Sequence, residues 1–294
     1  MLSVLKRSAP SSPEPVPSCP ARPELGVLSK LPTWATAAMD RILTGRCNRL
    51  DLYWAEPQRL MADAGLTPDP WQTTCLRSLG DRLLLLCARQ SGKSLVSGAL
   101  ALQTALLIPG SLTLLLSPTE RQSGELFRNK VLRLYNGLGR PVASVAESAL
   151  TMTLANGSRI VVLPGAEGNI RGYSGVAMLV IDEAARVPDE LYYAVRPMLA
   201  VSRGRLVALS TPFGKRGWFY DEWSGPARWE RIRITANECP RIPAEFLADE
   251  RLSLGPRWFA SEYECEFVDA VGAVFSHADI QAALSDEVLP LFGG

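Results

Sequence analysis

Four short runs rich in Leu, Val and Ile alternate along the chain with segments of helical character. Near-continuous apolar runs are typical of parallel strands whose sheet is covered by helices on both faces. Strands that alternate with helices predict an α/β fold. The predicted strands are residues 82–87, 111–117, 177–182 and 205–210.

A predicted β-hairpin interrupts this alternation. Its candidate strands, residues 150–154 and 159–163, flank Asn156-Gly157, a pair that tolerates the positive φ angles of a tight turn. We therefore expect a mainly parallel central sheet flanked by helices, with an inserted β-hairpin.

The chain divides into four predicted parts. Residues 1–24 are rich in Pro and Ser and are expected to be disordered. Residues 25–66 are expected to form a small helical part, with helices near 34–43 and 57–64. Residues 67–270 are the predicted main domain, and residues 271–294 read as a linker.

Composition excludes several kinds of chemistry. The formal net charge is +1, so binding to nucleic acid needs a local basic patch. His277 is the only histidine, which excludes His-rich zinc sites. Six Cys without a C-x-x-C pair predict free thiols in an intracellular protein. The uncharged stretch 95–117 is cut by Pro109 and Gly110, which favours a buried helix and strand over a membrane span.

The run at 82–87 leads directly into the sequence ARQSGKS at residues 88–94 and then into a helical segment. Strand, loop and helix in this order are the context of a phosphate-binding P-loop. There, backbone N–H groups face the phosphates, Lys93 neutralises charge on the β- and γ-oxygens, and the Ser94 hydroxyl can bind Mg²⁺. The full motif has Gly where Cys87 stands, so an exposed turn that matches by chance is the alternative.

The strand at 177–182 ends in two adjacent carboxylates, Asp182 and Glu183. Nucleotide hydrolysis needs both, and we expect Asp182 to hold the Mg²⁺ shell and Glu183 to orient and polarise the attacking water. An acidic pair after a strand is often only a helix N-terminus. Combined with Lys93 on another strand, the pair indicates a hydrolytic site.

Other residues are weaker candidates. Ser210-Thr211 ends a strand at the sheet edge where ligands of open α/β folds collect, although an ST turn before a proline explains it equally well. Arg171, in the Gly-rich segment 165–175, is suited to stabilise charge on phosphate. Gln72, beside Trp71, is either an adenine contact or a polar residue next to a buried Trp.

In this order the motifs resemble the ATPase domain of the large terminase subunit of tailed bacteriophages, the motor that drives double-stranded DNA into a procapsid. The resemblance covers residues 70–274. Members of this family also depart from the full P-loop motif at the first Gly, where this chain has Cys87. It rests on WQ at 71–72, ARQSGKS at 88–94, NGS at 156–158, IRG at 170–172, VIDEA at 180–184, STPFG at 210–214 and EYECE at 262–266.

The resemblance implies a P-loop NTPase fold of the ASCE type (additional strand, catalytic Glu), with ATP and Mg²⁺ as cofactors. Glu183 is implied as catalytic, Asp182 and Ser94 as metal ligands, and Ser210 and Thr211 as the coupling motif. Arg89 and Arg171 are candidates for a sensing or finger arginine, with the division of roles open. The implied nucleotide-binding residues are Gln72, Arg89, Gln90, Ser91, Gly92, Lys93 and Ser94.

The resemblance also implies partners and a location. They are double-stranded DNA, a portal protein and a small terminase subunit, in an oligomeric ring and without a membrane. The expected location is the cytoplasm of an infected or lysogenic bacterial host, and transiently the portal vertex of the procapsid. Candidate DNA contacts, equally explained as surface charge, are Lys215, Arg216, Arg228, Arg231 and Arg233.

Members of this family normally continue into a metal-dependent nuclease domain. Here Asp279, Asp286 and Glu287 stand in a predicted linker helix without further carboxylates for a two-metal site. We therefore expect no nuclease activity in this polypeptide.

Two alternatives remain open. A helicase-like translocase uses similar motifs but needs two motor domains, and the stretch after Ile234 is too short for a second α/β unit of about 150 residues. A non-catalytic terminase remnant would serve as an assembly module, docking through its helical N-terminal part. The presence of Lys93, Asp182 and Glu183 favours ATP binding over such a remnant.

Overall fold

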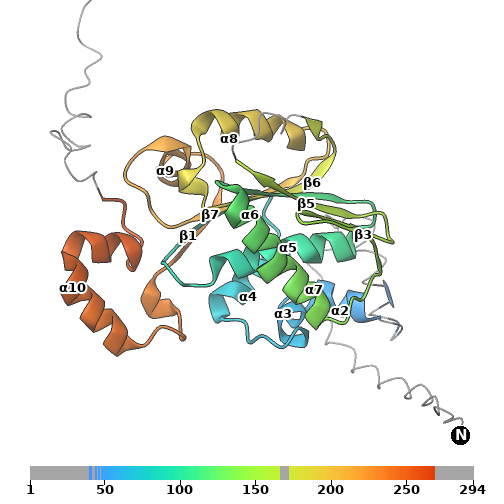
Figure 1. Cartoon of the computed structure of the whole chain (residues 1–294), viewed down its shortest axis with the longest axis horizontal. Coiled ribbons are helices and arrows are strands. Elements are labelled where there is room, and N and C mark those ends of the chain that lie inside the picture. The colour runs from blue at the N-terminus through green and yellow to red at the C-terminus, as the bar shows by residue number, and fades with distance from the viewer. Residues whose placement is uncertain (1–39, 42–43, 45, 47, 166–171, 269–294) are drawn as a thin grey trace, which may run out of the picture.

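An eight-stranded sheet forms the centre of the molecule (Figure 1). In this computed structural model, which describes residues 40, 41, 44, 46, 48–165 and 172–268, the strand order is β3-β4-β5-β2-β6-β7-β1-β8. β4 runs antiparallel to both its neighbours, and all other pairs are parallel. The strands are β1 (Arg82–Cys87), β2 (Leu112–Ser117), β3 (Ser144–Glu147), β4 (Thr151–Leu154), β5 (Arg159–Pro164), β6 (Val176–Asp182), β7 (Arg205–Ser210) and β8 (Glu230–Ile234).

Helices cover both faces of this sheet, as Figure 1 shows. One face carries α2 (Arg49–Ala55), α3 (Arg59–Asp63), α4 (Pro70–Arg77), α5 (Lys93–Leu107), α6 (Glu120–Leu126), the π-helix η2 (Phe127–Leu132) and α7 (Arg133–Gly137). The other carries α8 (Asp189–Val195), α9 (Gly217–Ser224), α10 (Ala244–Glu262) and the 3₁₀ turns η4 (Ala184–Arg186), η5 (Arg196–Leu199) and η6 (Ala236–Glu238).

Both faces of the central strands are buried. In β1, Leu83 and Leu85 pack into the cluster that contains α5, while Leu84 and Leu86 pack into the cluster that contains Trp218. Because successive side chains of a strand point to opposite faces, a strand between two helical layers must be apolar on both. The predicted α/β class and parallel sheet are therefore confirmed.

The four predicted strands are present with at most one residue of difference at an end. The predicted hairpin is also present, with Gly157 at a φ of 83°. It is built into the sheet, because β5 also pairs in parallel with β2. The uncharged stretch forms α5 and β2, and no described helix has the length and apolar character needed to cross a membrane.

Some sequence expectations fall outside the described residues. These include the disordered tail, nearly all of the helix at 34–43, and the linker with Asp279, Asp286 and Glu287. The predicted helix at 57–64 corresponds to α3. α2 was not predicted, and its Tyr53 shares one core cluster with Leu60 of α3 and with α5. The bounds of the four predicted parts stay predictions.

The parallel register brings several strand ends to one edge of the sheet. Leu86 pairs with Ser210, and Asp182 pairs with Leu209. β7 lies between β1 and β6, so the loop after β1 and the acidic end of β6 are separated by one strand. This edge is where an open α/β sheet binds ligands.

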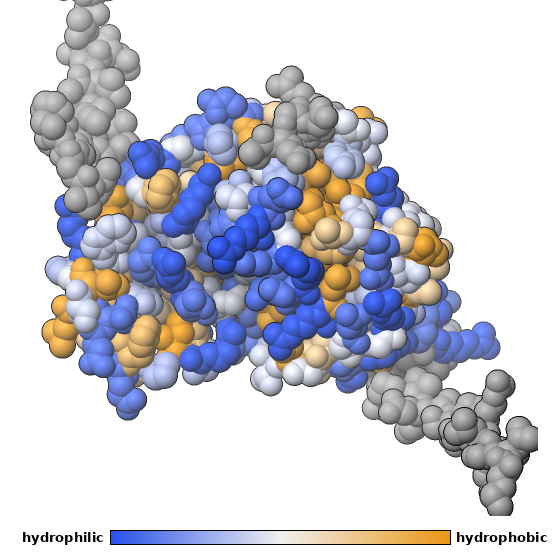
Figure 2. Space-filling view, viewed as in Figure 1, coloured by the Kyte–Doolittle hydropathy of each residue, from blue (hydrophilic) through white to orange (hydrophobic). Residues whose placement is uncertain are grey.

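α10 contains a kink and an exposed apolar surface. Gly255 has a φ of 73° and is followed by Pro256, which divides the helix. In Figure 2 a hydrophobic patch lies over this helix, which bears the exposed side chains of Phe246, Leu252, Leu254 and Trp258. The C-terminal end of α10 returns to the loop after β1.

Candidate functional site

The loop that connects β1 to α5 has an unusual backbone conformation. Gln90 and Gly92 have positive φ angles of 61° and 93°. The left-handed conformation costs a non-glycine residue about 1–2 kcal/mol, so its presence at Gln90 marks a constrained turn. The turn directs the chain into α5, whose first N–H groups lie at an open helix N-terminus suited to anions.

The start of this loop is anchored by distant segments. The Ala88 N–H donates to Ile234 O at 2.8 Å, and the Arg89 N–H donates to Glu262 O at 2.8 Å. The Arg89 guanidinium also lies 3.2 Å from a Glu262 carboxylate oxygen. The loop is therefore fixed to β8 and to the end of α10, residues far away in sequence.

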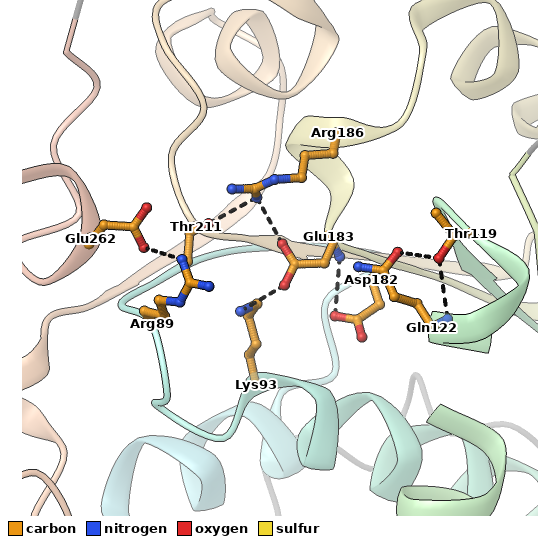
Figure 3. Close-up of polar contacts among 9 residues, drawn as sticks. All are labelled: Arg89, Lys93, Thr119, Gln122, Asp182, Glu183, Arg186, Thr211 and Glu262. Carbon is orange, nitrogen blue, oxygen red and sulfur yellow. Dashed lines mark hydrogen bonds and ion pairs between the residues drawn. The ribbon is translucent and has the colours of Figure 1, made fainter. Parts of the chain in front are cut away.

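Lys93 and Glu183 meet directly at the sheet edge (Figure 3). Lys93 Nζ lies 3.0 Å from Glu183 Oε1, and Arg186 Nη1 lies 2.9 Å from Glu183 Oε2. The same Arg186 nitrogen donates to Thr211 Oγ1 at 3.0 Å. The Glu183 carboxylate thus contacts both Lys93 and Arg186, and Arg186 in turn contacts Thr211 at the end of β7.

The backbone at Glu183 helps to create this junction. Its φ of 52° is left-handed, and η4 begins at the next residue. The turn brings Arg186 back over the Glu183 carboxylate. It also directs the Glu183 N–H to Asp182 Oδ1 at 3.1 Å.

Asp182 is buried, with 6% of its surface exposed. Burial raises the pKa of its carboxyl to about 6, while Lys93 and a hydrogen bond from Ser94 act in the opposite direction. The pair presents a carboxylate and a hydroxyl, the hard oxygen ligands that Mg²⁺ prefers. Among the described residues no group of three or more His, Cys, Asp or Glu could hold a metal ion. A single carboxylate and a hydroxyl fit the way Mg²⁺ is bound in nucleotide sites, where phosphate and water supply most of its ligands.

Lys93 is also buried, and burial acts to lower the pKa of its ammonium group. The negative charges of Glu183 and Asp182 outweigh burial and raise the pKa above its ordinary value. Lys93 is therefore a permanent cation in this site at neutral pH.

A pocket of about 360 Å³ opens beside these residues. Seven predicted site residues line it: Arg89, Gln90, Gly92, Lys93, Ser94, Glu183 and Thr211. Asp182, Ser91 and Ser210 are buried beside it rather than in its wall. Arg171 lies outside the described residues.

Gln72 is buried behind the loop and does not line the pocket. Its Oε1 accepts from the Asp69 N–H at 2.9 Å, as part of the N-terminal capping box of α4. Its amide nitrogen has no hydrogen-bond partner within the described part of the chain. A Cβ on Gly92 would lie 3.0 Å from that nitrogen, so the glycine allows α4 and the loop to touch.

Four polar residues of the site were not predicted from the sequence. The pocket is also lined by Arg186, Gln122 and Lys130. The fourth residue, Arg241, contacts the backbone of the loop. Arg241 Nη2 donates to Asp69 Oδ2 at 2.6 Å and to Ser91 O at 2.5 Å. Only Arg186, three residues after Glu183, had a signal in its sequence position.

Two of the candidate DNA-contacting arginines serve the fold. The Arg231 guanidinium donates to the carbonyl oxygens of Glu222, Gly225 and Ala227. Arg233 donates to Glu264 O. These contacts favour the structural explanation of both residues over the DNA-binding one.

β1, the loop at 88–92 and α5, with the acidic end of β6 beyond β7, define a P-loop NTPase fold of the ASCE type. The sequence profile described as "Terminase large subunit, T4likevirus-type, N-terminal" matches residues 84–282, more than half of the chain. The chain therefore belongs to the terminase large subunit family. This confirms the resemblance found in the sequence.

Individual relatives agree with the family. The large terminase subunit of Thermus phage G20c is 26% identical over 260 residues, which cover 76% of this chain and 53% of that protein. The corresponding protein of Escherichia phage T5 is 24% identical and is covered over 51% of its length. The chain thus spans about half the length of the curated relatives it matches.

Solved structures show the same fold. The large terminase ATPase domain of Thermus phage P74-26 superposes with a TM-score of 0.61 at 23% identity, covering 71% of this chain and 98% of that one. The large terminase of another thermophilic bacteriophage, solved in complex with ADP, gives a TM-score of 0.56 at 16% identity, covering 68% and 54%. These likenesses confirm the predicted fold.

Proposed function

We propose that this chain is the ATPase motor domain of a DNA-packaging terminase, coupling Mg²⁺-dependent ATP hydrolysis to movement of double-stranded DNA into a procapsid. The observation that carries the proposal is the 3.0 Å contact between Lys93, the first residue of α5, and Glu183, which follows β6. The strands that lead to these two residues, β1 and β6, are separated in the sheet by β7. An isolated turn that matched the P-loop motif by chance would not meet an acidic strand end. Membership of the terminase large subunit family supports the packaging role.

In this proposal the loop at 88–94 and the N-terminus of α5 bind the phosphates. Lys93 neutralises charge on the β- and γ-oxygens, and Gln90, Ser91 and Gly92 supply the loop backbone. Glu183 orients the attacking water and accepts its proton. Ser94 and Asp182 would hold Mg²⁺, which when bound supplies charge neutralisation for the phosphate oxygens. Gln72, behind the loop, is the proposed adenine-side residue.

We assign coupling to Ser210 and Thr211 at the end of β7. Thr211 accepts a hydrogen bond from Arg186, and Arg186 pairs with Glu183. A movement of Glu183 on hydrolysis would therefore be transmitted to the end of β7 through the Arg186 side chain. That contact gives the coupling motif a physical link to the proposed catalytic carboxylate.

We propose separate roles for the two candidate arginines, whose division the sequence leaves open. Arg89 belongs to the loop and pairs with Glu262, which suits a residue that senses the nucleotide from within the subunit. Arg171 is the proposed finger that stabilises transition-state charge on a neighbouring subunit's nucleotide. That role requires an oligomeric ring. The proposed partners of the ring are a portal protein, a small terminase subunit and double-stranded DNA, in a bacterial host.

ATP turnover by the purified chain tests this function. We expect slow hydrolysis by the wild type, loss of nucleotide binding in Lys93→Ala, and retained binding without turnover in Glu183→Gln. Equal hydrolysis by all three proteins would refute the site. A well-folded wild type that binds no nucleotide would instead support the non-catalytic remnant.

A further inference from the structure

One cation in the wall of the pocket has no counter-ion among the described residues. Arg89, Lys93, Lys130 and Arg186 all line the pocket. Arg89 pairs with Glu262, while Lys93 and Arg186 both pair with Glu183. No described carboxylate forms an ion pair with Lys130, which is half-buried. Such an ammonium group beside three other cations is unfavourable unless the pocket takes up an anion.

The position of Lys130 is fixed by close contact with α5. A Cβ on Gly98 would lie 2.9 Å from Lys130 Cβ and 3.2 Å from the Lys130 carbonyl carbon. The glycine therefore lets the backbone of η2 lie directly on α5. Gly98 and Ser94 share one face of α5, about 6 Å apart along the helix axis. The flexible four-carbon stem of a lysine can span that distance.

The local backbone is unusual at the same place. Lys130 belongs to η2, a π-helix, while its neighbours in that turn, Phe127 and Val131, are fully buried in the core. π-Helical turns are rare and are frequent at functional sites. This π-helix therefore packs Phe127 and Val131 into the core and places Lys130 in the pocket wall.

We propose that Lys130 is a second phosphate-binding lysine, whose ammonium group contacts the phosphate chain of the nucleotide bound at Ser94. The contact comes from the segment that follows β2, which the P-loop motif does not include. This inference rests on the proposed function, because it assumes that the pocket binds a nucleoside triphosphate. It adds a residue that senses the phosphates from a different element of the fold.

The test is ATP binding by the whole chain, with Lys130→Gln, Lys130→Arg and the matched control Arg133→Gln. Arg133 is exposed, lies three residues further on and does not line the pocket. Loss of a charge-assisted contact corresponds to about tenfold weaker binding or more. We expect that loss in Lys130→Gln, recovery to within about threefold in Lys130→Arg, and no change in Arg133→Gln. The salt dependence of binding should also be weaker in Lys130→Gln, since one ionic contact in a pocket open to solvent is gone.

The outcomes separate this inference from the function beneath it. If the wild type binds ATP and Lys93→Ala does not, the nucleotide site stands. Equal ATP affinity of Lys130→Gln and the wild type would then overturn the role of Lys130 alone. Unchanged ATP affinity with loss of stimulation by duplex DNA would overturn it as well, and assign the residue to DNA. Absence of ATP binding by the wild type would overturn both proposals.

Discussion

Lys93 Nζ lies 3.0 Å from Glu183 Oε1, so the ammonium group proposed to bind phosphate is paired with the carboxylate proposed to activate water. Both groups cannot perform these tasks while they hold each other. Uptake of a triphosphate must therefore draw Lys93 toward the phosphates and release one oxygen of Glu183. Arg186 keeps the other oxygen at 2.9 Å, so the carboxylate stays oriented when Lys93 leaves.

Substitution of Glu183 by Gln separates binding from hydrolysis. Glutamine cannot accept the proton of the attacking water, so turnover should fall by about 10²-fold or more. Lys93 no longer has to leave an anionic partner, so ATP should bind at least as tightly as in the wild type. Titration with a fluorescent ATP analogue and steady-state turnover measure the two effects. Glu190→Gln, exposed on α8, is the control, and weaker ATP binding by Glu183→Gln than by this control would contradict the argument.

Thr211→Val tests the link from Glu183 to β7. Valine keeps the shape of threonine but removes the oxygen that accepts from Arg186 at 3.0 Å. A hydrogen bond to a charged group contributes about 1.5–3 kcal/mol, so turnover should fall by at least about tenfold. Thr211→Ser keeps the hydroxyl and should retain most of the activity. Equal loss in both variants would show that packing matters there rather than the hydrogen bond.

Arg241 should support the loop without contacting the nucleotide. Its guanidinium joins Asp69 to Ser91 O, and Ser91 itself is fully buried. Arg241→Ala should therefore weaken ATP binding by about tenfold through loss of the charge-assisted contacts. Arg251→Ala is the matched control, because Arg251 stacks over Phe259 and pairs with Glu264, away from the loop. Binding assays on both variants decide, and equal affinities would refute the supporting role.

Gly98→Ala should destabilise the fold although alanine is the better helix former. The exchange gains about 1 kcal/mol in helix propensity. The new methyl group would lie 2.9 Å from Lys130 Cβ, and such overpacking costs about 1–3 kcal/mol. In Gly124→Ala the nearest atom is the mobile end of Arg128 at 3.3 Å, so this control should be stabilised. Urea unfolding measures both, and stabilisation of Gly98→Ala would show that η2 moves aside at no cost.

Buried thiols should make the protein sensitive to alkali. Burial raises the pKa of Cys75 and of Cys265 to about 12, against about 8.5 in an unfolded chain. The folded state therefore holds these protons more tightly, and the free energy of unfolding should be flat below about pH 8.5 and decline above it. Urea unfolding from pH 7 to 10 measures this slope. Cys75→Ala should flatten it, and an unchanged slope in that variant would contradict the assignment.

The sheet and the approach of Lys93 to the acidic end of β6 were predictable, because they follow from local sequence patterns and from the topology of a parallel sheet. Runs that are apolar on both faces define buried strands, and parallel strands carry their carboxyl ends to one edge. That rule alone brings Lys93, Asp182 and Thr211 together. α2 and β3 escaped prediction because one is a seven-residue helix and the other is a mostly exposed edge strand.

The supporting residues were not predictable in the same way. Arg241 acts on Asp69 across 172 positions, and Glu262 acts on Arg89 across 173. Arg186 follows a left-handed turn at Glu183, and Lys130 lies in a π-helix. Apart from the spacing of Arg186 three residues after Glu183, no pattern in the sequence reports these contacts. They arise from the tertiary packing of segments whose individual patterns are ordinary.

A crystal structure of the chain with Mg²⁺ and a non-hydrolysable ATP analogue tests the central claim most directly. The account predicts the phosphates in the loop at 88–94, with Lys93 moved from Glu183 to the β- and γ-oxygens. Ser94 and Asp182 would hold the metal ion. Arg186 should still hold Glu183. An analogue bound elsewhere, or phosphates in the loop with the pair of Lys93 and Glu183 intact, would contradict it.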